Sequence, residues 1–151
     1  MSISLLLEMA LDAAQSGNPG RTAVVSGDLR LTVDELSTLA DGGAGVIAAS
    51  GAGHIAYVGT GGALLPLLLF SAARADVAFT PLNYRLSADG LRALIDRLPN
   101  PLVIVDDEYR AAVGDGYRVL GSEEFVAQAR DKEPDEEIGR ASCRERVSSP
   151  V

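Results

Sequence analysis

The residues of this chain that could do chemistry lie in short segments that follow apolar runs. A glycine-rich loop at residues 59–62 (Gly-Thr-Gly-Gly) offers backbone amides that could hold a phosphate, and the acids at 106–108 offer carboxylates that could bind a metal or activate water. Arg85 offers a guanidinium, a group suited to phosphate recognition. His54 is the only histidine and Cys143 the only cysteine. A structural role competes with the chemical one at each position.

The structural role is the stronger interpretation for most of these candidates. Loop 59–62 lacks both the Gly-x-Gly-x-x-Gly spacing of dinucleotide sites and the Lys-Ser or Lys-Thr pair of a P-loop. We interpret it as a tight turn beside a closely packed helix, with phosphate binding as the alternative. His54 has no metal-ligand pattern around it and is expected to be structural or on the surface. The adjacent acids at 106–108 point in different directions and predict the solvated exit of a strand. We expect no catalytic and no metal-binding residue in this chain.

The elements that position these residues alternate between strand and helix. Apolar periodicity predicts helices over residues 5–14, 33–49, 63–74, 88–98 and 123–129, and strands over 54–58, 77–80, 102–105 and 117–120. Alternation of this kind predicts an α/β fold with a parallel sheet. Near the N-terminus, Ser26-Gly27-Asp28 between two short apolar runs predicts a β-hairpin. Ser122 is expected to cap the last helix.

The corner over residues 75–88 joins a strand to a helix through Pro-Leu-Asn-Tyr-Arg-Leu-Ser. Pro81 is expected to stop the strand because it has no N–H to donate, and Ser87 is expected to cap the following helix. Asp76 stands after a helix end, where a positive φ is often required and aspartate is tolerated.

This corner resembles that of the adenylate-forming superfamily, the acyl-CoA synthetases and their relatives, which typically carry Ala-Gly-Ala-Val-x-x-Pro-Leu-Asn-Pro-Arg-Leu-Ser. Asp76 replaces the usual glycine here and Tyr84 replaces proline. Upstream, Leu-Thr-Val-Asp-Glu-Leu at residues 31–36 resembles the family's Leu-Thr-Tyr-x-Glu-Leu, and its threonine and glutamate have the spacing of a capping box. The resemblance covers roughly residues 5–129.

The resemblance implies that residues 1–130 form an incomplete N-terminal subdomain of the adenylate-forming fold, with a parallel-sheet core, flanking helices and a small N-terminal hairpin. It implies a parent acyl-CoA synthetase that joins a carboxylic (fatty) acid to coenzyme A with ATP and Mg²⁺. Arg85 is implied to contact a coenzyme A phosphate, with a helix-capping or surface role as the alternative. The family's nucleotide loop ends in Lys-Gly, whereas the only lysine, Lys132, is flanked by acids. We therefore expect the chain to be inactive without the remainder of its parent.

Two other interpretations remain open at this point. The chain could be a complete small α/β binding or interaction domain. It could also be a fragment of another adenylating enzyme, such as a peptide-synthetase module or a luciferase-like ligase, because these enzymes share the early motifs.

The amino-acid composition limits the partners and the cellular location that we expect for this chain. A formal charge of −8 and a pI near 4.5 argue against non-specific nucleic-acid binding, which requires basic patches. Residues 42–73 carry no charge, but glycines divide this run into pieces shorter than the ~20 apolar residues that a membrane span needs. The N-terminus shows no signal peptide, so we expect a cytoplasmic protein.

The C-terminal residues differ in character from the rest of the chain. Residues 131–136 are expected to form an acidic linker. Residues 137–151 resemble the translation of a sequencing adapter and are expected to be non-native, the alternative being a native arginine-rich tail. Cys143 lies in this segment, so it gives no information about redox compartment or nucleophilic catalysis.

Overall fold

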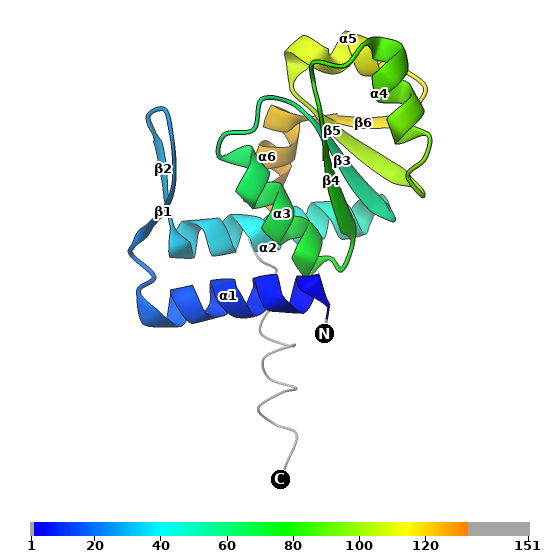
Figure 1. The fold of residues 1–151 in the computed structure, drawn as a ribbon. Coiled ribbons are helices and arrows are strands. Elements are labelled where there is room, and N and C mark those ends of the chain that lie inside the picture. The colour runs from blue at the N-terminus through cyan, green and yellow to red at the C-terminus, as the bar shows by residue number, and fades with distance from the viewer. Residues whose placement is uncertain (1, 133–151) are drawn as a thin grey trace.

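A four-stranded parallel sheet with helices on both faces forms the centre of the fold, which the computed structural model describes for residues 2–132 (Figure 1). The helices are α1 (Ile3–Gly17), α2 (Val33–Ser50), α3 (Leu64–Arg74), α4 (Ala88–Ile95), α5 (Arg110–Val113) and α6 (Ser122–Asp131), with a 3₁₀ turn over Asp107–Tyr109. The strands are β1 (Thr22–Ser26), β2 (Leu29–Thr32), β3 (His54–Val58), β4 (Ala78–Leu82), β5 (Pro101–Val105) and β6 (Arg118–Gly121). The adapter-like segment 137–151, with Cys143, lies outside the described residues, as does the linker from residue 133 onward.

The strand order confirms the predicted α/β architecture. β1 and β2 pair antiparallel as the predicted hairpin, which projects from one side of the molecule (Figure 1). The main sheet has the order β4-β3-β5-β6, and all its pairs are parallel. The chain leaves β3 towards β4 on one side and then returns to β5 on the other. The carboxyl ends of β3 and β5 therefore flank a topological switch point, where ligands bind in open α/β sheets.

The central strands are apolar on both faces because both faces are covered. Ile55 and Tyr57 of β3 pack in the cluster that includes residues of α1, α2, α3 and α6. Ala56 and Val58 point to the opposite face and pack with residues of α4 and α5. Side chains alternate along a strand, so the continuous apolar run of β3 requires helices on both sides, as observed.

Helix α2 is held between α3 and α6 by two adjacent glycines. A Cβ at Gly42 would overlap the backbone of Ala129 in α6, and a Cβ at Gly43 would overlap the Ser71 side chain in α3. Neither glycine has a positive φ, so close packing is the reason for glycine at both positions. The pair lets the helices approach closely enough to bury the shared core.

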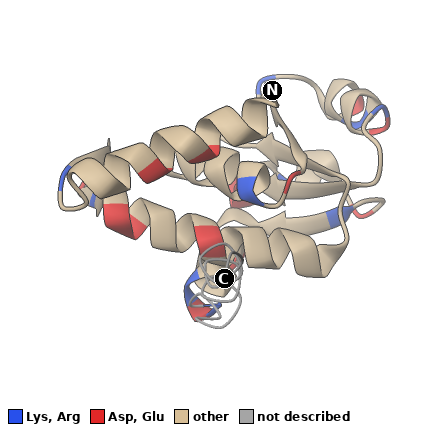
Figure 2. Cartoon of the chain, turned by 90° about the horizontal axis from the view of Figure 1, so that it is seen from below, with Lys and Arg blue, Asp and Glu red and all other residues tan. Residues whose placement is uncertain are grey.

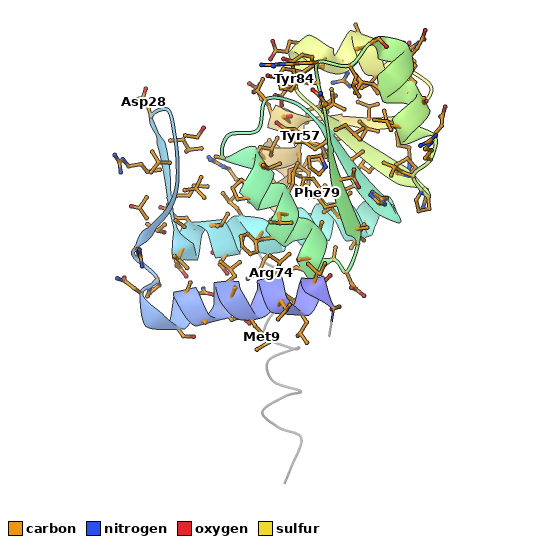
Figure 3. All side chains as sticks on the ribbon, in the orientation of Figure 1. Met9, Asp28, Tyr57, Arg74, Phe79 and Tyr84 are labelled. Carbon is orange, nitrogen blue, oxygen red and sulfur yellow. The ribbon has the colours of Figure 1, made fainter. Side chains whose placement is uncertain are left out.

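Arg74 connects the three N-terminal helices. Its guanidinium donates to the Ser37 carbonyl at 2.6 Å and to the Ser37 hydroxyl at 2.9 Å, and it pairs with Asp41 of α2. Asp12 of α1 lies 4.0 Å away. Acidic residues lie along the long helices (Figure 2), and Arg74 lies beside α1 at the lower end of the sheet (Figure 3). Its charge therefore offsets the acidic character where α1, α2 and α3 meet.

Two of the three predicted helix caps, and the positive φ of Asp76, are confirmed. The Thr32 hydroxyl accepts from the Glu35 amide at 3.1 Å, and the Glu35 carboxylate accepts from the Thr32 amide at 2.8 Å. The Ser87 hydroxyl accepts from the Gly90 amide at 3.1 Å. Asp76 has φ 54°. These local signals depend on a few adjacent residues, which explains why they could be predicted from the sequence.

Several predicted boundaries were wrong. Pro81 does not stop its strand but lies inside β4, in register with Tyr57, because β4 is an edge strand and needs partners on one side only. The helix predicted to reach residue 98 ends at Ile95. Ser122 is not the N-cap of α6, since Gly121 takes that position and the Ser122 hydroxyl bonds to Asp106 instead. The short α5 and the 3₁₀ turn were not predicted.

Among residues 2–132, the structure contains no helix that is both long enough and apolar enough to cross a bilayer.

Candidate functional site

The candidate residues come together at the carboxyl edge of the sheet. The loop 59–62 follows β3, the corner with Arg85 follows β4, Asp106 follows β5 and Ser122 follows β6. Parallel strands place all these segments at one edge, since their carboxyl ends are aligned. Tyr57 and Tyr84 lie towards this edge, whereas Arg74 lies at the opposite end (Figure 3).

Asp106 is the centre of a hydrogen-bond network at the switch point. Its carboxylate accepts from the Tyr57 hydroxyl at 3.2 Å, from the Thr60 amide at 3.0 Å and from the Ser122 hydroxyl at 2.5 Å. The prediction of a solvated strand exit was therefore wrong for Asp106, which is half-buried, although Asp107 and Glu108 are exposed. Its three partners lie 16 to 49 residues away, so no local pattern could reveal the network.

The glycine-rich loop is held tightly by the same network. The Thr60 amide donates to Asp106, and the Gly61 amide donates to the Tyr57 hydroxyl oxygen at 3.1 Å. Gly61 and Gly62 have φ of 95° and 64°, which side chains rarely adopt. A Cβ at Gly59 would overlap both Asp106 and the Tyr57 hydroxyl. The tight-turn interpretation is confirmed, and two of the amides that could have held a phosphate are engaged within the protein.

Tyr57 is a member of the site that the sequence analysis missed. Its side chain is 2% exposed, and burial raises the pKa of its hydroxyl to about 12, with the negative charge of Asp106 contributing to the rise. The Gly61 amide opposes this shift because it favours the anionic oxygen. The hydroxyl therefore remains protonated and donates to Asp106 throughout the physiological pH range.

Arg85 belongs to a separate cluster on the neighbouring corner. The Tyr84 and Tyr109 rings are 5.1 Å apart at 40°, and the Arg85 guanidinium carbon lies 5.6 Å from the centre of the Tyr84 ring. The Arg85 amide donates to the Asn83 side chain at 3.0 Å, which shapes the turn. Ser87 caps the next helix, so Arg85 is not the capping residue. The exposed guanidinium beside two aromatic rings can stack against a planar group and pair with a phosphate.

His54 has the structural role that was expected. One of its ring nitrogens lies 2.7 Å from the Thr80 hydroxyl on the neighbouring strand, and partial burial lowers the pKa of the imidazole. Across residues 2–132, His, Cys, Asp and Glu side chains form no group of three or more that could hold a metal ion.

Comparison with known proteins shows which sequences and folds this chain resembles. No protein-family model matches the chain. In sequence, the chain is 31% identical over 103 residues to an indoleacetate–CoA ligase of Aromatoleum aromaticum, a match that covers 66% of this chain and 20% of the ligase. In structure, it resembles a Mycobacterium tuberculosis fatty acyl CoA synthetase with a TM-score of 0.75 and 19% identity, covering 85% of this chain and 29% of that one.

Two further solved structures extend this likeness. A benzoate CoA ligase from Burkholderia xenovorans gives a TM-score of 0.72 at 18% identity, with 80% of this chain and 28% of the ligase covered. An artificially fused adenylation–PCP di-domain of a nonribosomal peptide synthetase from Klebsiella oxytoca also gives 0.72, at 16% identity, with 85% and 25% covered.

These likenesses confirm the resemblance drawn from the corner and capping-box motifs. The structural neighbours are adenylate-forming acyl-CoA synthetases and adenylation domains of nonribosomal peptide synthetases, and the fold is that of their N-terminal subdomain. The chain spans about a fifth of the length of the indoleacetate–CoA ligase and less than a third of the structural neighbours described above.

Proposed function

We propose that this chain is the N-terminal part of a cytoplasmic ATP-dependent acid–thiol ligase, an acyl-CoA synthetase. The observation that carries the proposal is the 31% sequence identity to a CoA ligase over 103 residues. The fold alone is shared with peptide-synthetase adenylation domains, so it does not separate coenzyme A from a carrier protein as the thiol. The sequence likeness favours coenzyme A.

The chemistry of such a ligase replaces a poor leaving group at a carboxylate with a good one. A carboxylate oxygen of the acid attacks the α-phosphorus of ATP, the bond to the β-phosphate breaks, and pyrophosphate leaves. The coenzyme A thiolate then attacks the acyl carbonyl, the bond to the adenylate oxygen breaks, and AMP leaves. Mg²⁺ would neutralise phosphate charge in the first step, where electrostatic stabilisation provides much of the rate.

The described residues supply little of the site for the first step. The Thr60 and Gly61 amides already donate to Asp106 and Tyr57. Within residues 2–132 there is no cluster of acidic and imidazole side chains that fits a metal ion. The residues that bind ATP and Mg²⁺ are therefore assigned to the remainder of the parent enzyme, and we expect this chain alone to be inactive.

The corner after β4 is the part of the chain that we assign to coenzyme A. The nucleotide base would stack on Tyr84 and Tyr109, and Arg85 would pair with a phosphate of the same nucleotide. The support for this assignment is the 5.1 Å ring pair with an exposed guanidinium beside it.

The test begins with the genomic DNA that follows the codon for Glu136. We expect a reading frame that continues into a Ser/Thr/Gly-rich loop ending in Lys-Gly. The restored enzyme should exchange pyrophosphate with ATP in the presence of its acid and then release a coenzyme A thioester, while this chain alone should do neither. A stop codon would overturn the proposal. Transfer of the acyl group from the adenylate only to a carrier-protein thiol, with release of AMP, would assign the parent to the peptide synthetases.

A further inference from the structure

Helix α1 has an apolar outer face that no part of the described chain covers. Leu11 is the one buried residue of α1 and packs in the core with residues of α2 and α3. The outer face, on the other side, consists of exposed apolar residues: Ile3, Leu5, Leu6, Met9, Ala10 and Ala13. Its four large side chains are each at least 44% exposed. α1 forms the lower edge of the molecule (Figure 1), and Figure 3 shows Met9 on the side of α1 away from the sheet.

The outer face carries no charge. Of the two charged residues of α1, Glu8 is partly buried and Asp12 lies 4.0 Å from Arg74 of α3, so both are on the side turned to the other helices. The ends of α1 also lack charges, since its first turn has no acid and its last turn no base. By contrast, α2, α4 and α6 have acids in the first turn, and α3 has Arg74 in the last. No side chain of α1 therefore offsets its helix dipole.

The spacing of the outer face suits contact with a second helix. Ile3, Leu6, Ala10 and Ala13 are three, four and three residues apart, the spacing of a coiled-coil seam. The two large residues precede the two small ones. If two copies of α1 pack antiparallel about a twofold axis near residue 8, Ile3 of each lies opposite Ala13 of the other, and Leu6 opposite Ala10. Each large side chain then meets a small one, whereas a parallel pair would place large against large.

We propose that α1 joins two copies of this chain in a symmetric dimer, through an antiparallel pair of helices. The two dipoles then run in opposite directions, so the positive end of each helix lies beside the negative end of the other. A lipid surface is disfavoured as the occupant, because α1 has no Lys or Arg and the chain has a net charge of −8. For two acidic copies, an uncharged face is where the repulsion is least. The proposal does not depend on ligase activity.

The area of the contact predicts a weak dimer. At roughly 30 Å² for each methylene-sized group, the exposed parts of the four large side chains and the two alanines supply about 350 Å² per copy. A stable interface buries about 800 Å² per partner, and much smaller ones are weak or transient. We therefore expect exchange between monomer and dimer with a dissociation constant of about 0.1 mM.

Sedimentation equilibrium of the full chain, from about 10 µM to about 1 mM, tests the dimer. Leu6→Glu places a charge in the contact once in each copy and should weaken association about tenfold. Leu65→Glu is the matched control, because it puts the same charge on a leucine of α3 that is 38% exposed and lies outside α1. It should leave association unchanged. A chain that stays monomeric over the whole range, or equal weakening by the two variants, would overturn the proposal.

Two complementary variants test the antiparallel register. Ile3→Glu and Ala13→Lys each replace an exposed residue and place a charge where it favours the helix dipole, so α1 itself is not weakened. Each variant alone should associate about threefold more weakly. An equimolar mixture should regain dimer, because the introduced acid and base lie opposite each other across the axis.

Two results would contradict this register or this occupant. No recovery in the mixture of Ile3→Glu and Ala13→Lys would overturn the antiparallel contact. Flotation of the monomeric chain with phosphatidylcholine vesicles, abolished by Leu6→Glu, would also overturn the proposal and would identify a lipid surface as the occupant of the outer face.

Discussion

Two loops at the same edge of the sheet differ in how their charged side chains contact the rest of the protein. The loop after β5 places Asp106 in contact with donors from β3, from the glycine-rich loop and from α6. The corner after β4 holds its backbone through Asn83, but the Arg85 side chain is exposed and has no hydrogen-bond or ion-pair partner among residues 2–132.

The difference separates a residue that shapes the fold from one that is available to a ligand. Donors from Tyr57, Thr60 and Ser122 would lose their acceptor if the Asp106 carboxylate were removed, and a buried donor without an acceptor lowers the free energy of unfolding. Removal of the Arg85 guanidinium would leave no protein group unpaired within the described residues. A substitution at Asp106 should therefore lower the free energy of unfolding, whereas a substitution at Arg85 should weaken the binding of a ligand.

Asp106→Ala is expected to have the largest effect on stability. It leaves the Tyr57 hydroxyl, the Thr60 amide and the Ser122 hydroxyl without their acceptor, and should lower the free energy of unfolding by about 3 kcal/mol. Urea unfolding monitored by circular dichroism measures this change. Asp107→Ala, at the exposed neighbouring acid, is the control and should stay within about 0.5 kcal/mol. Equal effects of the two variants would show that the network does not stabilise the fold.

Gly59→Ala is expected to have the next largest effect. The added methyl group would overlap the Asp106 carboxylate and the Tyr57 hydroxyl, so the loop must shift and the free energy of unfolding should fall by about 2 kcal/mol. Gly116→Ala is the matched control, because its Cβ would meet no atom within 4 Å and its φ is not positive. Thermal unfolding of both variants should separate them, and a Gly59→Ala variant as stable as Gly116→Ala would contradict the packing described here.

The contrast between the loops also explains what the sequence could reveal. The corner and the capping box are local patterns, so the sequence predicts the roles of Ser87, Asp76, Thr32 and Glu35 correctly. The Asp106 network joins segments brought together only by the strand order β4-β3-β5-β6. Strand order depends on tertiary packing, and periodicity does not encode it.

Pro81 and Ser122 show the same limit in single residues. Proline was expected to end a strand, but an edge position removes the need for its missing donor, and edge status is a property of the whole sheet. Serine before an acidic helix start was expected to be a cap, but Gly121 takes the N-cap position, and the Ser122 hydroxyl in the first turn of α6 donates to Asp106. Tyr57 carried no local signal, because an aromatic residue in an apolar strand is normally part of the core.

The Tyr57 hydroxyl predicts a smaller effect that depends on pH. Its pKa is raised to about 12 in the folded state from 10.0, so the folded state holds the proton more tightly. The stability it contributes is fully present below pH 10 and is lost as the pH rises from 10 to 12. Urea unfolding of the native chain should show this decline, and Tyr57→Phe should show less of it. The difference between the two isolates Tyr57, because the hydrogen bond to Asp96 raises the pKa of Tyr117 as well.

Arg85→Ala is expected to have the smallest effect on stability and a specific effect on binding. The side chain is exposed, so the free energy of unfolding should change by less than about 0.5 kcal/mol. In the restored enzyme the KM for coenzyme A should rise by about tenfold, since a phosphate would lose a charge-assisted hydrogen bond. The KM values for ATP and for the acid should stay unchanged, and Arg97→Ala, at another exposed arginine, should alter none of the three. An unchanged KM for coenzyme A would remove the Arg85 assignment, while a stability loss as large as that of Asp106→Ala would show that the two loops do not differ in the way their contacts indicate.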